Sequence, residues 1–286
     1  MRLRYDIKIK KLCFYFVLSL TCINFACTKN RYEQTMDPLF SIITVTWNAA
    51  TTVGATLKSV QRQTSSDYEM LIIDGASTDD TLAIVRQASI ASLRVFSEPD
   101  EGLYDAMNKG IARSRGRYVI FLNAGDAFAD DTVLARLAVL AASNPGVIYG
   151  QTQLVNAQGQ VVGKRHLTAP KRLTANSFLN GMVVCHQAFV ARRDLVPQYD
   201  LQYRLSADYD WCIRILKQSP ANAYAGTTPI ISYLADGMTT RHHRASLWER
   251  YRIMCRHYGT GKATLRHLGF IPRFLKRRLG GSANRQ

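Results

Sequence analysis

Short apolar runs alternate with segments of helical periodicity through the first half of the chain. The runs are rich in β-branched side chains, and they are FSIITV (40–45), MLIID (70–74), LRVF (93–96), YVIFL (118–122) and VIYG (147–150). Runs of this kind predict strands buried on both faces, as in a parallel sheet. Strands that alternate with helices predict an α/β fold with a mainly parallel, doubly wound sheet, in which ligands bind beyond the carboxyl ends of the strands.

The segments between these runs carry apolar residues at helical spacing. The expected helices lie within residues 46–63, 76–88, 101–116 and 130–143. The second is expected to begin behind Ser77 or Thr78, with Asp79 and Asp80 in its first turn, where carboxylates suit the helix dipole.

The pattern changes after residue 150. QTQLVNAQGQVVGKRH (151–166) predicts a hairpin, MVVCHQAFV (182–190) and ISYL (231–234) predict strands, and DYDWCIRILKQ (208–218) predicts a helix. No internal repeat and no low-complexity linker interrupts the chain. We therefore expect one domain, residues 36–240, with a mixed, specialised second half.

The net charge of +16 lies in the two tails. Residues 1–35 hold 7 Lys/Arg and 2 acids, residues 241–286 hold 12 and 1, and the part between them is balanced at 18 and 18. A neutral middle with basic ends suits an anionic surface, a membrane or a polyanion, better than it suits a DNA-reading domain. No nucleic-acid partner is expected.

The N-terminal extension leaves three interpretations open. Basic residues precede the apolar run LCFYFVLSLTCINFAC (12–27), which is the order of a signal anchor or a cleaved signal peptide, although the run is short for a span. Translation from Met36 is the third interpretation. Six cysteines without a CxxC pair favour reduced thiols over a zinc site.

Several common nucleotide and catalytic motifs are absent. The chain has no GxGxxG after its first strand, no GxxxxGK[ST], no HExxH and no GxSxG. Carboxylates instead gather around the expected carboxyl edge of the sheet: Asp74, Asp79, Asp80, Glu98, Asp100, Asp105 and Asp126. That composition suits a divalent cation with a diphosphate ligand, and hydrogen bonds to a base and a ribose.

Five ordered segments resemble a known family. They are SIITVTWN (41–48), LIIDGASTDDT (71–81), SEPDEGLYDAMNKGIARSRGRYVIFLNAGD (97–126), HQAFVARRDL (186–195) and SADYDWCIRI (206–215). Together they resemble a family 2 glycosyltransferase with the GT-A fold, and most of all the bacterial colanic-acid and exopolysaccharide transferases. The long central block is the specific part of the match, because each short motif alone is weak.

The resemblance implies a donor site at the ends of the first two strands. Thr46 to Asn48 would border the nucleotide, and Asp74 would accept a hydrogen bond from the base ring, with Ser77 and Asp79 beside it. Asp100 or Asp105 would approach the ribose or the diphosphate. For Asp80, helix capping is the simpler interpretation.

The turn after the fourth strand departs from the family pattern. Family members usually carry D-x-D there, which holds Mg²⁺ or Mn²⁺ against the diphosphate. Here the turn is Asn123-Ala124-Gly125-Asp126, so the resemblance leaves Asp126 as the metal carboxylate and Asn123 as an uncharged contact to ribose or the metal shell. The cation would rely on the diphosphate oxygens and water for its other ligands.

The resemblance places the catalytic base at Asp208, in SADYDW, where it would remove a proton from the acceptor hydroxyl in an inverting reaction. Asp210 is either an acceptor-side residue or, as we prefer, the partner of Arg214 at i,i+4. His186 is either a structural histidine or an acceptor-side contact.

The C-terminal tail, residues 241–286, mixes aromatic and aliphatic residues with many arginines. We expect 246–258 to pack on the catalytic domain and 266–279 to contact anionic lipid. The implied enzyme is cytoplasmic and peripheral on the inner face of the cytoplasmic membrane. It transfers sugar from a nucleotide-diphosphate sugar to a lipid-linked or growing saccharide in exopolysaccharide, capsule or lipopolysaccharide biosynthesis. The alternatives are a non-catalytic nucleotide-binding subunit of a polysaccharide assembly complex and an exported surface protein.

Overall fold

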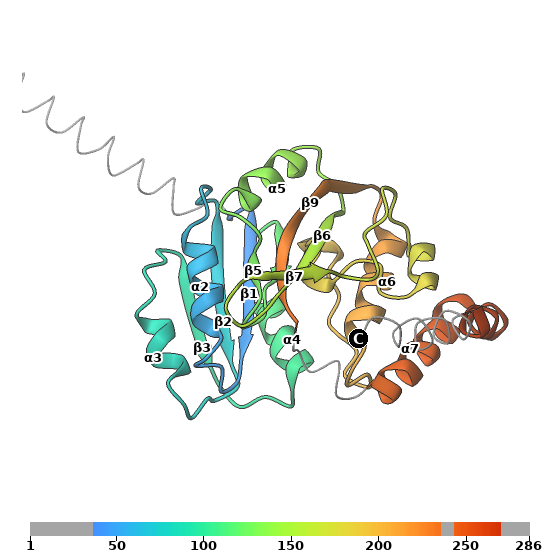
Figure 1. Cartoon of the computed structure of the whole chain (residues 1–286), viewed down its shortest axis with the longest axis horizontal. Coiled ribbons are helices and arrows are strands. Elements are labelled where there is room, and N and C mark those ends of the chain that lie inside the picture. Colours follow the sequence, from blue (N-terminus) through green and yellow to red (C-terminus); the bar gives the residue numbers. More distant parts are fainter. Residues whose placement is uncertain (1–36, 236–242, 270–286) are drawn as a thin grey trace, which may run out of the picture. The chain divides into compact units, whose positions relative to one another are not determined.

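The computed structural model of the protein describes residues 37–235 and 243–269 (Figure 1). The chain divides into two units, Met1–Asp37 and Pro38–Gln286, and the following description concerns the second. The N-terminal extension expected at 1–35 lies outside the described residues.

The first four strands form the predicted parallel half of the sheet. They are β1 (Phe40–Thr46), β2 (Tyr68–Asp74), β3 (Leu93–Ser97) and β4 (Tyr118–Phe121), paired in the order β3-β2-β1-β4. Every residue of β1 is buried, as its continuous apolar run predicts. The register sets Thr46 opposite Asp74 and Asp74 opposite Ser97. Three polar side chains therefore meet at the carboxyl edge of the sheet.

Helices connect the strands at the predicted places. They are α2 (Val53–Gln61), α3 (Thr81–Arg86), α4 (Leu103–Arg113) and α5 (Val133–Ala141). α4 lies against β1 and β2. Gly110 permits this close packing, because a Cβ at that position would lie 2.5 Å from Cγ2 of Ile43.

The predicted start of α3 is wrong by several residues. The helix begins at Thr81, behind Asp80, so Asp79 and Asp80 precede its first turn. Asp79 is engaged elsewhere: one carboxylate oxygen accepts from the Thr81 amide at 3.0 Å and the other from the Ala50 amide at 3.1 Å. Ser77 does not cap the helix, because its hydroxyl hydrogen-bonds to Asp74.

The second half of the sheet is mixed. β8 (Phe189–Arg192) pairs antiparallel with β4, β6 (Val147–Val155) pairs antiparallel with β8, and β9 (Asn222–Leu234) pairs parallel with β6. β7 (Val161–Lys164) completes the predicted hairpin with β6, and the two-residue β5 (Ala127–Phe128) pairs with β9. In the described part of the chain these nine strands form one sheet (Figure 1).

The strand predicted over 182–190 is mostly wrong. Only its last residues, from Phe189, join the sheet, and the preceding residues form the short 3₁₀ turn η2 (His186–Ala188). Two further 3₁₀ turns are η1 (Ala175–Asn180) and η3 (Arg193–Leu195). The side chains of His186 and Gln187 form hydrogen bonds to the turn after β4 instead of extending a strand.

The C-terminal helices are α6 (Ala207–Gln218) and α7 (His243–Tyr258), followed by helical residues 260–269. α7 contacts α6, and its Ile253 and Met254 are buried, which confirms the packing expected for 246–258. Among the residues that the structure describes, no helix is both long enough and apolar enough to cross a bilayer.

An aromatic cluster fixes α6 on the sheet. The fully buried Trp211 has its ring centroid 5.1 Å from Tyr199, 5.7 Å from Phe121 of β4 and 5.8 Å from Phe189 of β8. Large buried aromatic side chains dominate the energetics of such contacts. The start of α6, four residues before Trp211, is therefore held close to the end of β4.

Candidate active site

Asp74 organises the carboxyl edge of β1 and β2 from a buried position. One of its oxygens accepts from the hydroxyls of Thr46, at 2.9 Å, and Ser77; the other accepts from the Ser77 amide at 2.9 Å and the Ser97 hydroxyl at 2.8 Å. Burial would raise the pKa of Asp74, but these hydrogen bonds outweigh it and lower the pKa below its usual value. Asp74 thus fixes Thr46 and Ser77, and it exposes no surface to a ligand.

The loop after β1 is joined to the loop after β2 by hydrogen bonds. The Asn48 amide donates to the Ser77 hydroxyl at 2.8 Å, and the Asn48 side-chain carbonyl accepts from the Thr78 amide at 2.9 Å. Asn48 has a φ of +48°, a conformation that asparagine tolerates better than most residues. Asn48, Ser77 and Asp79 therefore build the rim of one rigid site.

Trp47 and Asp100 flank this rim. Trp47 lies between Thr46 and Asn48, and 70% of it is exposed, which is unusual for so large an apolar residue. A Cβ at Gly75 would lie 2.3 Å from Oδ2 of Asp100 and 3.4 Å from Cδ1 of Trp47. Gly75 thus allows a carboxylate and an indole ring to reach the same point of the edge.

Asp105 lies in the first turn of α4, where it is already paired. It accepts from the Glu101 amide at 3.1 Å and lies 3.1 Å from Nζ of Lys109. Lys109 also donates to the Pro99 carbonyl at 2.6 Å. Asp105 and Lys109 therefore hold the loop that carries Asp100.

The turn after β4 brings Asn123 and Asp126 together. The Asp126 amide donates to the Asn123 carbonyl at 2.9 Å, and the Thr56 hydroxyl of α2 donates to the Asp126 carbonyl at 2.7 Å. Gly125 has a φ of +99°, and a Cβ there would lie 2.9 Å from Leu234, so the turn requires glycine. The Asn123 side-chain oxygen is buried and has no hydrogen-bond partner among the residues that the structure describes.

The carboxylate of Asp126 is nearly inaccessible to solvent. Its oxygens accept from Nε2 of Gln187 at 2.8 Å and from the Leu234 amide at 3.1 Å. Burial raises the pKa of Asp126 to about 6 despite these donors and the nearby His186. Within the described residues no three His, Cys, Asp or Glu side chains could together hold a metal, so the acids expected to cluster at the edge do not form a metal cage.

Asp208 lies at the first turn of α6. Its Oδ1 accepts from the Tyr104 hydroxyl at 3.2 Å and from the Tyr209 amide at 2.9 Å, and its Oδ2 lies 3.3 Å from Nδ1 of His186. Burial would raise the pKa of Asp208, but the hydrogen bond and charge of His186, then the charge of Arg250, lower it below its usual value. Asp208 is therefore ionised at neutral pH, as a general base must be.

His186 bridges the two halves of the site. On one side Nδ1 faces Asp208, and on the other Nε2 lies 3.3 Å from Nδ2 of Asn123. In its neutral form, His186 suits these contacts with its proton on Nδ1, which donates to Asp208 while Nε2 accepts from Asn123. The structure thus connects the turn after β4 to Asp208 through one imidazole ring.

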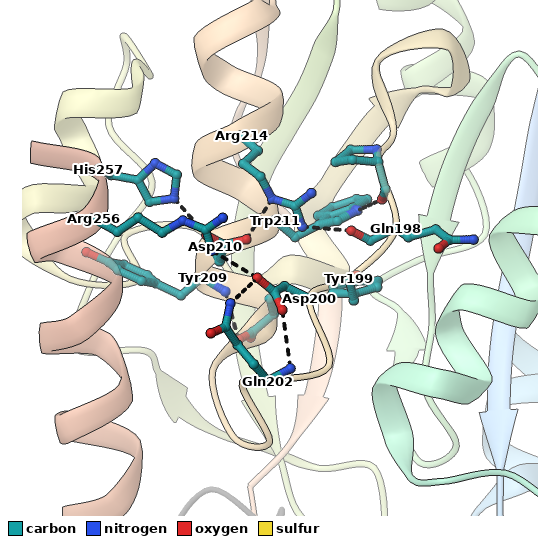
Figure 2. A network of polar contacts seen from close by, with 12 residues as sticks. Gln198, Tyr199, Asp200, Gln202, Tyr209, Asp210, Trp211, Arg214, Arg256 and His257 are labelled. Carbon is teal, nitrogen blue, oxygen red and sulfur yellow. Dashed lines mark hydrogen bonds and ion pairs between the residues drawn. The ribbon is translucent and has the colours of Figure 1, made fainter.

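The acceptor-side role considered for Asp210 is contradicted by the structure. Asp210 is fully buried, and its oxygens pair with Nε of Arg214 at 2.6 Å and Nε2 of His257 at 2.7 Å. Figure 2 shows this cluster between α6 and α7, where Arg256 also reaches Asp200. The preferred pairing with Arg214 is confirmed, and Asp210 joins α7 to the domain.

The sequence did not predict individual roles for three residues of the site. Gln187 supports Asp126, Tyr104 supports Asp208, and Trp47 lies exposed within the segment expected to border the nucleotide. A glutamine, a tyrosine and a tryptophan carry no charge or motif that marks them as functional. Their places inside HQAF, GLYDAMNKG and TVTWN were the available signal.

Comparison with known proteins agrees with this arrangement. The family model described as glycosyl transferase family 2 matches residues 41–199. A PGL/p-HBAD biosynthesis glycosyltransferase of Mycobacterium bovis is 35% identical over 188 residues, which are 62% of this chain and 69% of the relative. The Escherichia coli UDP-Glc:alpha-D-GlcNAc-diphosphoundecaprenol beta-1,3-glucosyltransferase WfgD is 27% identical, over 65% of this chain and 73% of its own.

Solved structures share the fold at low sequence identity. S. aureus TarS 1–349 in complex with UDP-GlcNAc has a TM-score of 0.62 and 17% identity, covering 88% of this chain and 76% of its own. The mannosyltransferase PcManGT from Pyrobaculum calidifontis, in complex with GDP-Man and Mn²⁺, has a TM-score of 0.54 and 15% identity over 93% and 90%. The chain belongs to glycosyl transferase family 2 and is a glycosyltransferase with the GT-A fold.

Proposed function

We propose that this glycosyltransferase moves a sugar from a nucleotide-diphosphate sugar to a lipid-linked or growing saccharide, with inversion, in exopolysaccharide, capsule or lipopolysaccharide assembly. The observation that carries the proposal is the His186 bridge between Asn123 and Asp208. It places a buried, ionised carboxylate beside the turn at which family 2 enzymes hold the leaving diphosphate.

The donor nucleotide would bind at the rim formed after β1 and β2. Trp47 offers an exposed aromatic face for the base, and Asp100 offers a carboxylate for the ribose hydroxyls. Thr46, Asn48, Asp74, Ser77 and Asp79 would act together by fixing the rim, through their hydrogen bonds to one another and to the backbone. The complexes of TarS with UDP-GlcNAc and of PcManGT with GDP-Man support a nucleotide sugar as donor.

Transfer then follows from the position of Asp208. Its carboxylate accepts the proton of the acceptor hydroxyl as the hydroxyl oxygen forms a bond to the anomeric carbon. The bond from this carbon to the diphosphate breaks, and its electron pair leaves with the nucleoside diphosphate. Attack from the face opposite the leaving group inverts the anomeric centre.

A divalent cation, Mg²⁺ or Mn²⁺, fits the turn if the diphosphate supplies most of its ligands. Within the described residues the buried Asn123 side-chain oxygen has no hydrogen-bond partner, and each oxygen of Asp126 accepts from one donor, which leaves it a further lone pair. Mg²⁺ is commonly bound by one or two carboxylates plus substrate phosphates. When bound, the cation would neutralise charge on the departing diphosphate.

A lipid-linked acceptor is supported by the name of WfgD, which specifies a diphosphoundecaprenol saccharide. The C-terminal region of this chain offers suitable membrane-facing residues: Trp248, Leu265 and Leu268 are exposed, amid the positive charge of residues 241–286. Contact with anionic lipid would place the enzyme on the inner face of the cytoplasmic membrane.

Two measurements test the proposal on the full-length chain. Calorimetric titration with UDP and with GDP, with and without Mn²⁺, should reveal binding of one nucleotide that tightens with the cation. Incubation with radiolabelled UDP-glucose, UDP-N-acetylglucosamine or GDP-mannose and a bacterial lipid extract should move label into the lipid phase. Absence of both nucleotide binding and sugar transfer would contradict the proposed function. Nucleotide binding of equal affinity with and without Mn²⁺ would contradict only the proposed role of the cation.

A further inference from the structure

A pocket of about 540 Å³ opens between the start of α4 and the loop before α6. One wall includes Glu101, Tyr104 and Asp105, and the other includes Leu201, Tyr203 and Arg204. Tyr104 connects this pocket to the site described above, because its hydroxyl donates to Asp208 at 3.2 Å. We propose that this pocket binds a pyranose ring of the acceptor saccharide. The proposal rests on the proposed transfer function.

The lining has the chemistry of a sugar site. Glu101 and Arg204 are exposed residues of the lining, and their charged groups can accept from and donate to ring hydroxyls. Leu201 is exposed and can contact the C–H face of a sugar ring, and the largely buried Tyr104 and Tyr203 also line the pocket. Ligand pockets typically combine such apolar walls with a few polar groups that fix orientation.

The same lining disfavours the donor diphosphate. Asp105 is paired with Lys109, but Glu101 adds a second carboxylate to the same wall, and a carboxylate repels a diphosphate. The features that suit a nucleotide, Trp47 and Asp100 beside Gly75, lie at the β1–β2 edge and do not line the pocket. A neutral, hydroxyl-rich ligand therefore fits the pocket better than a polyphosphate.

The second wall is preformed, because α7 holds it. The Glu249 carboxylate accepts from the amides of Arg204 and Leu205 at 3.0 and 2.8 Å. Arg256 lies 2.9 Å from Asp200, at the start of the same loop. A loop fixed at both ends loses little entropy when a ligand binds, so it suits a recognition surface.

The test uses UDP and the p-nitrophenyl β-glycosides of glucose, galactose and N-acetylglucosamine as probes. Saturation-transfer NMR detects glycoside binding to the full-length protein in the presence of UDP, and calorimetry measures UDP affinity. Leu201→Trp fills the pocket from an exposed position. Val139→Trp, at an exposed aliphatic residue of α5 that does not line the pocket, is the control.

We expect at least one glycoside to bind the wild type and the control variant. Leu201→Trp should weaken that binding by about tenfold or more, the range for a steric change in a pocket, with the UDP affinity unchanged. Glu101→Gln should weaken it too, without creating a steric block. The proposal is overturned if no glycoside binds the UDP-loaded wild type, or if the Leu201→Trp variant binds glycoside with wild-type affinity. It is also overturned if this substitution lowers the affinity for UDP and leaves glycoside binding unchanged. Failure of the wild type to bind any nucleotide would overturn the proposed function itself.

Discussion

Asp126 illustrates the cost of burying a carboxylate. Among the described residues two hydrogen bonds support its side chain, and burial raises its pKa to about 6. The folded protein therefore holds the Asp126 proton more tightly than the unfolded chain does. The ionised Asp126 carboxylate therefore destabilises the folded state. This loss of unfolding free energy is absent below pH 3.8, where Asp126 is protonated in both states, and complete above about pH 6.

Asp126→Asn should raise the free energy of unfolding of the metal-free protein near neutral pH while it abolishes sugar transfer. The rise in pKa from 3.8 to about 6 corresponds to roughly 3 kcal/mol as an upper value. We expect urea unfolding to show a more stable variant near neutral pH, no gain at about pH 4, and loss of sugar transfer. If the variant is less stable than the wild type at both pH values, the ionised Asp126 carboxylate does not destabilise the fold as we expect.

Gln187 is buried and donates to the Asp126 carboxylate, so we expect it to act as a positioning residue. Gln187→Leu removes the donor to the Asp126 carboxylate and should cost about 1–3 kcal/mol in unfolding free energy. It should also weaken Mn²⁺-dependent UDP binding by about tenfold or more, as loss of outer-shell partners of metal ligands commonly does.

The control for Gln187 is Gln151→Leu. Gln151 is a partly buried glutamine, and it bridges the Ala169 carbonyl and the Tyr224 hydroxyl. This control should lose stability while keeping the Mn²⁺ dependence of UDP binding, measured by calorimetry. If both variants behave alike, the effect of Gln187 is purely structural.

At the residue scale, the sequence identified most residues of the candidate site, but it could not distinguish the roles of residues that are close together in the chain. Asp208 and Asp210 both begin the same predicted helix, yet residues two apart project from different faces. Only the packing of α7, which brings His257 to Asp210, distinguishes the structural acid from the candidate base. The role of His186 likewise depends on a contact with Asn123, 63 positions away.

At the scale of elements, α7 forms a brace, a set of hydrogen bonds that holds the loop before Asp208 in place. It does so through Glu249, and through Ser246, whose hydroxyl lies 3.0 Å from that of Ser206. The matched family region ends at residue 199, so this brace lies beyond it. The positions of α7 and the pocket wall are therefore coupled.

Glu249→Ala should loosen this brace, because two backbone amides lose their acceptor. We expect a loss of about 1–3 kcal/mol in unfolding free energy, together with a higher KM for the acceptor and an unchanged KM for the donor. Asp194→Ala is the control, since it breaks an exposed ion pair with Arg192 that should contribute little. Equal effects of the two variants on acceptor KM would count against the brace.

The predicted elements succeed where periodicity is strong and fail where tertiary pairing decides. The four parallel strands and α2, α4, α5 and α6 follow from apolar spacing. β5 has two residues and β8 four, too few to show a period. β8 also inserts between β4 and β6, which local sequence cannot reveal because the pairing joins distant segments.

At the scale of the whole molecule, a neutral catalytic region carries a strongly basic C-terminal segment. Trp248 is 63% exposed on α7, and Leu265 and Leu268 are exposed on the following helical residues. Charge composition predicted an anionic partner, but composition alone cannot say which side chains would contact it.

Membrane association should be electrostatic and should depend on these side chains. We expect flotation of the full-length protein with vesicles containing anionic phosphatidylglycerol, less with neutral vesicles, and less at high salt, because salt screens the attraction. Trp248→Ser should weaken flotation, whereas Val139→Ser on α5 should not. Equal flotation with anionic and neutral vesicles would contradict the proposed attraction.

The most direct test of the transfer mechanism is the turnover of Asp208→Asn with the donor and acceptor that the wild type uses. Asparagine keeps the size of the side chain and an acceptor for Tyr104, but it cannot take up the acceptor's proton. We predict that turnover falls by about a hundredfold or more, with UDP affinity unchanged by calorimetry. Wild-type turnover in this variant would contradict the assignment of Asp208 as the base.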